Sequence, residues 1–158
     1  MTVAKLLQVA RTKGLMIATA ESCTGGMVSA AITDIPGSSA IFDRGFVTYT
    51  NAAKTRMLGV DSATLTAHGA VSEPVAAQMA QGALTHSDAQ IAVAITGIAG
   101  PGGSDHKPEG QVCFGLAWRG NVRTETVAFG ARGRAAVRRA ATEHAVQLLL
   151  QAADQHDG

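Results

Sequence analysis

The stretch Leu15–Gly26, which reads LMIATAESCTGG, decides the fold. Its first half, Leu15–Ala20, is a short apolar run, too short for a helix and long enough for a buried strand. Its second half, Glu21–Gly26, is polar and ends in two glycines, and the small apolar residues Met27–Thr33 that follow indicate a helix. A buried strand that passes through a glycine-rich turn into a helix is typical of α/β folds, in which ligands bind at the strand ends.

The spacing of apolar residues predicts an alternation of helices and strands along the rest of the chain. We expect helices at 3–13, 27–33, 51–58, 72–86 and 134–152, and strands at 15–20, 42–50, 90–96, 111–118 and 122–129. The last two strands are joined by Arg119-Gly120-Asn121, which is a hairpin signal. The chain is therefore expected to form a single layered α/β/α domain over residues 1–158, with a mixed sheet and a C-terminal β-hairpin followed by a long helix.

Composition limits the class of protein. Of the 158 residues, 46% are hydrophobic and 16% are charged, which is the balance of a packed globule. The net charge of +1 argues against a dedicated nucleic-acid binder, and no apolar run is long enough to span a membrane. We see no signal peptide, and Cys23 and Cys113 do not form a CxxC pair, so a cytoplasmic protein is expected.

The first glycine-rich loop is a candidate for nucleophilic chemistry. Either Ser22 or Thr24 could attack a carbonyl carbon, with neighbouring backbone amides as an oxyanion hole, or either could simply cap the following helix. Cys23 is a further candidate, but no histidine lies near it in sequence. A buried Lys54 could act as the base for a serine, although a lysine at that position is also typical of a solvated helix surface.

Two further segments suggest ligand contacts. The loop 96–103, TGIAGPGG, is neither a GxGxxG motif nor a P-loop, but its glycines would allow a ligand to approach the backbone, or they could only form turns. Lys107 could supply charge beside it. Arg134 and Arg138 are four residues apart on the last helix and could clamp a phosphate or form a solvated basic stripe. The five histidines are scattered and no Cys/His cluster exists, so we do not expect a metal site. No cofactor is expected either.

Together these segments resemble the CinA C-terminal domain family, also described as nicotinamide-nucleotide amidases or competence-damage-inducible proteins. The resemblance rests on ATAESCTGG at 18–26, YTN at 49–51 with Lys54, LGV at 58–60, GAVSE at 69–73, AITGIAGPGG at 94–103, and Lys107-Pro108 with Gly110. The resemblance covers nearly the whole chain. The N-terminal domain of longer family members is absent here, so the stand-alone amidase form is expected.

The resemblance implies hydrolysis of the carboxamide of nicotinamide mononucleotide, giving nicotinic acid mononucleotide and ammonia without a metal. It makes Ser22 the nucleophile, Lys54 its base, and Tyr49 and Thr96 polar partners in the site. The substrate-binding positions that it implies are Cys23, Thr24, Gly25, Gly26, Gly100, Lys107, Arg134 and Arg138. The family usually has an acidic residue just before the first of these arginines, whereas here Gly133 stands there. A homo-oligomer is also implied.

Two other classes of function compete with an amidase. One is a glycine-rich nucleotide-binding or sensor domain without turnover, and the other is a regulatory protein whose active site has decayed. A binder needs only the glycine loops and the arginines, so the joint presence of Ser22, Tyr49 and Lys54 favours an enzyme.

Overall fold

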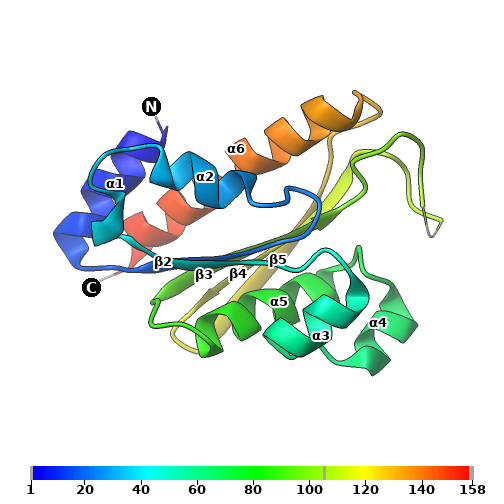
Figure 1. The fold of residues 1–158 in the computed structure, drawn as a ribbon, viewed down its shortest axis with the longest axis horizontal. Helices are drawn as coiled ribbons and strands as arrows, with labels where there is room; N and C mark the ends of the chain where they lie inside the picture. Colours follow the sequence, from blue (N-terminus) through cyan, green and yellow to red (C-terminus); the bar gives the residue numbers. More distant parts are fainter. Residues whose placement is uncertain (1, 105, 157–158) are drawn as a thin grey trace.

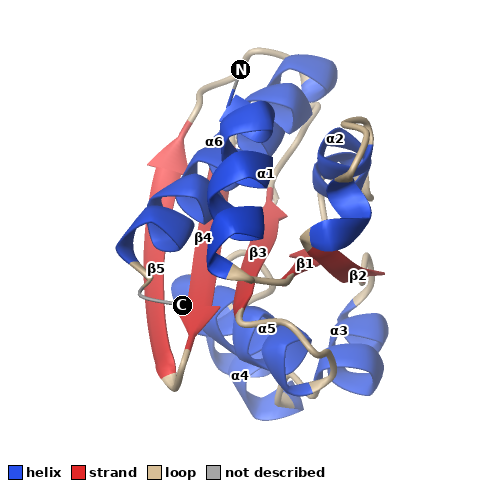
Figure 2. Cartoon of the chain, turned by 90° about the vertical axis from the view of Figure 1, so that its left-hand side faces the viewer, coloured by secondary structure: helices blue, strands red, loops and turns tan. Residues whose placement is uncertain are grey.

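The computed structural model describes residues 2–104 and 106–156, so positions 1, 105, 157 and 158 of the expected 1–158 domain lie outside the described residues. A sheet lies between two layers of helices (Figure 1). The strands are β1 Ile17–Glu21, β2 Phe42–Val47, β3 Ile91–Gly97, β4 Gln111–Trp118 and β5 Asn121–Ala128. The α-helices are α1 Thr2–Lys13, α2 Met27–Thr33, α3 Asn51–Leu58, α4 Ser62–His68, α5 Glu73–Thr85 and α6 Arg134–Gln155. One face of the sheet carries α1, α2 and α6, and the other carries α3, α4 and α5 (Figure 2).

The sheet is mixed, and its topology creates a crevice at the end of β1. The strand order is β2-β1-β3-β4-β5, in which β1 pairs in parallel with both β2 and β3, while β4 and β5 run antiparallel. The chain leaves β1 toward β2 on one side, and β3 lies on the other side. This is a topological switch point, where open α/β sheets bind ligands. The layered α/β/α arrangement, the mixed sheet, the C-terminal hairpin and the long last helix are thus confirmed.

The two central strands bury different side chains on their two faces. Toward α1, α2 and α6 they place larger residues in one core cluster, namely Ile17, Ile91, Val93 and Ile95. Toward α5 they place only small ones, namely Ala18, Ala20, Ala92 and Ala94. The helix α5 therefore packs very close to the sheet, and a Cβ added at Gly115 of β4 would lie 2.3 Å from the Ala76 carbonyl oxygen. Burial on both faces explains why short apolar runs predicted these strands.

Some boundaries differ from the predicted ones. The strand β2 ends at Val47 instead of position 50, because Thr50 caps α3 by accepting a hydrogen bond from the Ala53 N–H. The helix α4 was not predicted, since Leu65 is its only buried residue and one apolar side chain sets no helical period. At the hairpin, Arg119 and Gly120 both have positive φ, as a two-residue turn requires, and Asn121 already belongs to β5.

The last helix, α6, is 22 residues long and continues to Gln155, three residues beyond its predicted end at 152. Its buried residues lie against the sheet and against α1 and α2. Across residues 2–104 and 106–156, no helix combines the length and the apolar character that crossing a membrane would need.

Candidate active site

The turn between β1 and α2 presents Ser22 at the switch point. The Ser22 N–H continues the sheet by donating to the Ile95 carbonyl at 2.9 Å, and its own carbonyl accepts from the Gly25 N–H at 3.0 Å. Gly25 and Gly26 have φ of 56° and 106°, a left-handed region that side chains other than glycine rarely adopt. The two glycines thus let the chain reverse abruptly into α2, and the Ser22 side chain stays at the end of the strand.

Glu21, which sequence reasoning did not single out, is the structural centre of this turn. Its side chain is fully buried. Its Oε1 accepts from Thr24 Oγ1 at 2.7 Å, Val28 N at 2.9 Å and Gly26 N at 3.3 Å, and its Oε2 accepts from Ser29 N at 3.0 Å and Ser29 Oγ at 2.8 Å. The carboxylate therefore caps α2 in place of Gly26, which has no side chain. An acidic residue at the end of a buried apolar strand was the available signal.

The neighbouring hydroxyl and thiol are poor alternatives to Ser22. The Thr24 hydroxyl is fully buried and donates to Glu21, so it faces away from any substrate. Cys23 is only 4% exposed, and burial raises the pKa of its thiol to about 11. Since the thiolate is the reactive form, this cysteine is largely unreactive near neutral pH.

Lys54 lies in the first turn of α3 and reaches across to Ser22. Its side chain is 1% exposed, and its Nζ is 3.1 Å from Ser22 Oγ. The other two neighbours of Nζ are the carbonyl oxygens of Thr48 and Tyr49, each at 3.2 Å. The structure therefore brings together the serine and the lysine that the sequence placed 32 positions apart.

The surroundings of Lys54 favour its neutral form. Burial lowers the pKa of this lysine below its ordinary value of 10.5, and a negative charge on Cys23 would oppose that shift. Because burial also keeps the Cys23 thiol protonated, the opposing charge is absent near neutral pH. A neutral amine has two N–H donors, which match the two carbonyl oxygens, and one lone pair, which can accept the Ser22 hydroxyl proton. The 3.1 Å contact is short enough for such a proton transfer.

Tyr49 and Arg134 form an exposed contact at the rim of the site. The Tyr49 side chain is 56% exposed, and its hydroxyl accepts from Arg134 Nη2 at 2.9 Å. Arg134 Nη1 donates to the Gly100 carbonyl at 2.7 Å. Arg134 therefore links the loop after β2 with the glycine loop after β3, and it brings three of the predicted site residues together.

Arg138, one turn further along α6, contacts the β1–α2 turn instead. Its Nε donates to the Cys23 carbonyl at 3.0 Å, and its Nη2 lies 3.4 Å from the Thr24 carbonyl. A Cβ added at Gly25 would lie 3.4 Å from the same Nη2, so the guanidinium packs directly on the turn. The two arginines predicted as a pair thus contact different loops.

Thr96 and Lys107 both hold the segment between α4 and α5. Thr96 Oγ1 donates to the Ala70 carbonyl at 2.8 Å, while Lys107 Nζ donates to the carbonyls of His68, at 2.9 Å, and Val71. A cavity of about 420 Å³ opens beside this segment. Its volume is within the usual range for a small-molecule site. It is lined by Asn51, Leu65, Thr66, His68, Gly69, Ala70, His106 and Lys107.

The described part of the chain contains no cluster of three or more His, Cys, Asp or Glu side chains that could hold a metal ion. The expectation of a reaction without a metal or a cofactor stays a prediction, and it is tested by activity in the presence of a chelator.

Comparison with known proteins places this chain among relatives of the same fold. The family model of the CinA C-terminal domain matches residues 2–153. Nicotinamide-nucleotide amidohydrolase PncC of Escherichia coli K12 is 55% identical over 146 residues, which cover 91% of this chain and 88% of that protein. The crystal structure of competence/damage inducible protein CihA from Agrobacterium tumefaciens matches with a TM-score of 0.89 at 50% identity, covering 98% of this chain and 97% of that one. A CinA superfamily protein from Klebsiella pneumoniae 700603 matches with a TM-score of 0.94 at 36% identity, covering the same shares of the two chains. The chain belongs to the CinA C-terminal domain family.

Proposed function

We propose that this chain hydrolyses the carboxamide of nicotinamide mononucleotide to nicotinic acid mononucleotide and ammonia, with Ser22 as the nucleophile and Lys54 as its base. The observation that carries the proposal is the 3.1 Å approach of a buried lysine amine to a serine hydroxyl at the switch point of the sheet. The similarity to a nicotinamide-nucleotide amidohydrolase over most of the chain supports the choice of substrate.

The reaction divides into acylation and deacylation. Neutral Lys54 takes the hydroxyl proton of Ser22 as Oγ attacks the carboxamide carbon, and a tetrahedral oxyanion forms. The resulting Lys54 ammonium gives its proton to the leaving nitrogen, the C–N bond breaks, and ammonia departs from an acyl-Ser22 ester. Water then attacks the ester carbon while Lys54 takes a proton from it. Lys54 returns that proton to Ser22 Oγ as the C–O bond breaks and the carboxylic acid is released.

The backbone of the β1–α2 turn offers an oxyanion hole. Among residues 2–104 and 106–156, no oxygen atom accepts from the N–H groups of Cys23 and Thr24, whereas the Gly25 N–H donates to the Ser22 carbonyl. The residue after a nucleophile at a strand-to-helix turn commonly supplies such a donor. The Thr24 N–H shares a peptide plane with the Cys23 carbonyl, which Arg138 holds from the opposite side. Arg138 would then orient the peptide that stabilises the oxyanion.

Positive charge around the site suits a substrate phosphate. In the described part of the chain, none of Lys107, Arg134 and Arg138 forms an ion pair, and their donors meet only carbonyl and hydroxyl oxygens. Arg134 is exposed at the rim, where its guanidinium can exchange a neutral partner for a phosphate oxygen. We assign the phosphate to Arg134. Arg138 would be a second phosphate ligand only if it could bind the phosphate and keep its contacts with the β1–α2 turn.

The competing function is a nucleotide-binding domain without turnover. Binding alone would use the glycine loops and Arg134, but it gives no reason to bury a lysine amine beside a serine hydroxyl. Taking an amine out of water is costly, and the cost is explained if the neutral amine is needed as a base.

The test is ammonia release from nicotinamide mononucleotide by the purified protein. Ser22→Ala should lower kcat by about three orders of magnitude or more, because a nucleophile acts as a unit with its base. Lys5→Arg, a change at an exposed lysine of α1, serves as the surface control. Wild-type protein that binds the nucleotide without releasing ammonia would support the sensor function instead. Retention of more than about a tenth of the wild-type turnover by Ser22→Ala would exclude Ser22 as the nucleophile.

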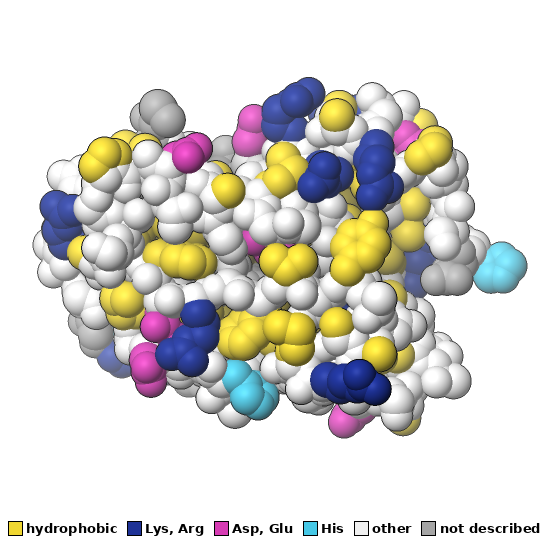
Figure 3. Space-filling model, in the orientation of Figure 1, with side chains coloured by type: hydrophobic (Ala, Val, Ile, Leu, Met, Phe, Trp, Pro, Cys, Tyr) yellow, Lys and Arg dark blue, Asp and Glu magenta, His cyan; other side chains and the backbone are white. Residues whose placement is uncertain are grey.

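The implied homo-oligomer stays a proposal, and the open edge of β2 is the surface that would carry it. Hydrophobic side chains gather across the middle of the face in Figure 3. Val47, Tyr49 and Met57 are exposed by 47%, 56% and 43%, and they lie at the end of β2 and on α3. Light scattering of wild type and Met57→Lys would test it, since a charge within the contact should shift the mass toward that of a monomer.

A further inference from the structure

We propose that Glu109 is a positioning residue of this site: its carboxylate holds the start of α6 against the glycine loop after β3, and so sets where the Arg134 guanidinium lies. The inference rests on the proposed function, in which Arg134 binds the substrate phosphate. Glu109 belongs to the segment that leads into β4, and neither the motifs nor the expected site residues included it.

The carboxylate of Glu109 joins two segments that are far apart in sequence. Its Oε1 accepts from the Gly102 N–H at 2.7 Å, and its Oε2 accepts from the Gly133 N–H at 3.1 Å. Gly102 lies in the glycine loop after β3, and Gly133 is the N-cap of α6. Both segments lie at the same end of the molecule in Figure 1, where the orange start of α6 approaches the yellow-green loop.

The start of α6 needs a carboxylate from elsewhere. Its N-cap, Gly133, has no side chain to accept a hydrogen bond, and the first turn contains no acidic residue. A helix of 22 residues nevertheless carries partial positive charge at this end, and its first N–H groups have no partner within the helix. Glu109 supplies both the acceptor and the negative charge that the local sequence lacks.

Glu109 also packs against the residue that holds Arg134. A Cβ added at Gly100 would lie 2.6 Å from Glu109 Cδ and 2.7 Å from its Oε1, so the side chain covers Gly100 directly. The Gly100 carbonyl accepts from Arg134 Nη1, and Arg134 Nη2 donates to Tyr49. The Glu109 carboxylate therefore holds Gly133, next to the backbone of Arg134, and packs against Gly100, which binds the guanidinium. In this way it contacts the segments at both ends of the arginine side chain.

This arrangement positions the arginine without neutralising it. Within residues 2–104 and 106–156, Glu109 forms no ion pair, and each of its oxygens accepts from a backbone N–H group. A carboxylate paired directly with Arg134 would compete with a phosphate for the guanidinium. Bound to the backbone, it holds the helix and leaves the positive charge of Arg134 for a ligand.

The first test compares a charged with an uncharged substrate. Glu109→Gln keeps the size of the side chain but turns one amide donor toward a backbone N–H, which breaks one of the two contacts. We expect the KM for nicotinamide mononucleotide to rise about tenfold while kcat changes less than about twofold, and kcat/KM for nicotinamide riboside to change less than about twofold. Glu109→Gln in an Arg134→Ala background should cause no further loss, since the two changes remove the same contact.

The second test does not depend on activity. Tyr49 is the only tyrosine in the chain, so labelling tyrosine at Cζ with ¹³C gives one NMR signal that reports on the Arg134 contact. Glu109→Gln should move that signal toward its position in Arg134→Ala. Glu143→Gln, which removes an exposed carboxylate further along α6, is the matched control and should leave the signal in place.

The outcomes separate this inference from the proposed function. An unmoved tyrosine signal in Glu109→Gln would overturn the positioning role, whatever the activity. Equal losses on both substrates, or additive losses with Arg134→Ala, would show that Glu109 only supports the fold. If the wild type hydrolyses neither substrate, the proposed function fails, and a shifted tyrosine signal still establishes that Glu109 positions Arg134.

Discussion

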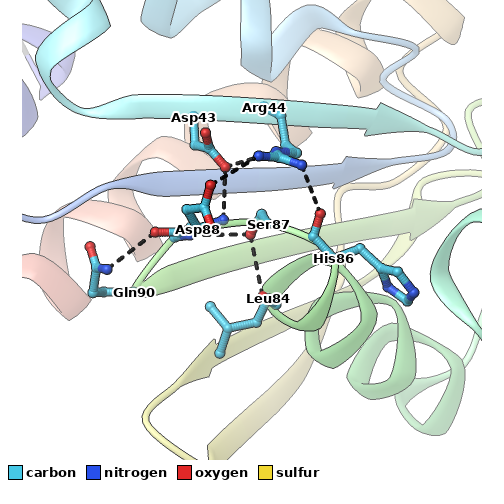
Figure 4. A network of polar contacts seen from close by, with 8 residues as sticks. Asp43, Arg44, Leu84, His86, Ser87, Asp88 and Gln90 are labelled. Atoms are coloured by element: carbon cyan, nitrogen blue, oxygen red, sulfur yellow. Dashed lines mark hydrogen bonds and ion pairs between the residues drawn. The ribbon is translucent and has the colours of Figure 1, made fainter.

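Arginine side chains have different partners at the two ends of the parallel strands. At the amino end, Arg44 of β2 lies between two carboxylates, with Nε 2.8 Å from Asp43 Oδ2 and Nη2 3.3 Å from Asp88 Oδ2. Arg44 Nη1 donates to the His86 carbonyl, and the Asp88 N–H donates to Asp43 (Figure 4). At the carboxyl end, Arg134 and Arg138 meet only neutral oxygens of the protein.

The difference indicates which end serves a ligand. A guanidinium between two carboxylates has its charge neutralised, and at the amino end it only ties β2 to the loop before β3. A guanidinium held by carbonyl oxygens is fixed in place but keeps its charge. A phosphate is costly to desolvate unless it meets such a charge, so the proposed phosphate site fits the carboxyl end better than the amino end.

The largest effect that would test this comparison is at Lys54. Lys54→Arg should lower kcat by about three orders of magnitude, because a guanidinium does not give up its proton at neutral pH. Arg44→Lys, the reverse change at the amino end, should leave kcat within about twofold of wild type. The measurement is the rate of ammonia release for both variants. A fully active Lys54→Arg protein would contradict a lysine base and leave Lys54 a structural role.

The pH profile of the wild type tests the same base. Burial lowers the pKa of Lys54, and the proposed base acts in its neutral form, so kcat should rise with pH and level off above that lowered pKa. The plateau should be reached below the ordinary lysine value of 10.5. A rate that keeps rising up to this value would show that Lys54 titrates as an ordinary lysine, and it would argue against a desolvated base.

Local chemistry left Ser22 and Thr24 open as nucleophiles or helix caps, and the family resemblance then selected Ser22. The run from an apolar strand through two glycines into a helix indicates a nucleophile turn. It can be recognised in the sequence because each of its features is local. Lys54 was a candidate base from the residues alone, with a solvated helix surface as the alternative, and the resemblance favoured the base. Nothing local shows that a lysine 32 positions later turns its amine toward Ser22. Glu21 and Glu109 were missed for a related reason. Their roles are set by backbone N–H groups of other segments, and the arrangement of those groups in space is not encoded in a motif.

The next prediction distinguishes the roles of the two arginines of α6. Arg134→Ala should lower kcat/KM for nicotinamide mononucleotide by about tenfold to a hundredfold and leave nicotinamide riboside nearly unchanged, because it removes a partner of the phosphate. Arg138→Ala should lower kcat on both substrates alike, because it releases the carbonyls of Cys23 and Thr24 and hence the oxyanion-hole peptide. A loss confined to the phosphorylated substrate in Arg138→Ala would instead make Arg138 a phosphate ligand.

A smaller effect concerns stability at the amino end. The Asp88 N–H and the Arg44 guanidinium lower the pKa of Asp43 below its ordinary value of 3.8. A lowered folded-state pKa adds stability above the unfolded-state value, and this stability is lost as the pH falls through the folded-state value. Asp43→Asn should therefore lower the free energy of unfolding by up to about 1 kcal/mol at pH 7, and by less at pH 3. Chemical denaturation at the two pH values measures it, and an equal loss at both would assign the effect to packing.

The smallest effect lies at the carboxyl end, at Thr48, just after β2. Its backbone groups are both hydrogen-bonded: the N–H donates to the Glu21 carbonyl, and the carbonyl accepts from Lys54 Nζ. Its side chain is fully buried, and within the described residues Oγ1 has no hydrogen-bond partner. A buried hydroxyl without a partner is unfavourable, so Thr48→Val should raise the free energy of unfolding by up to about 1 kcal/mol and change kcat less than about twofold. Thr50→Val is the matched control, because that hydroxyl caps α3 and its loss should cost about 1 kcal/mol. A fall in kcat of about tenfold in Thr48→Val with unchanged stability would mean that the hydroxyl takes part in moving the proton between Lys54 and Ser22.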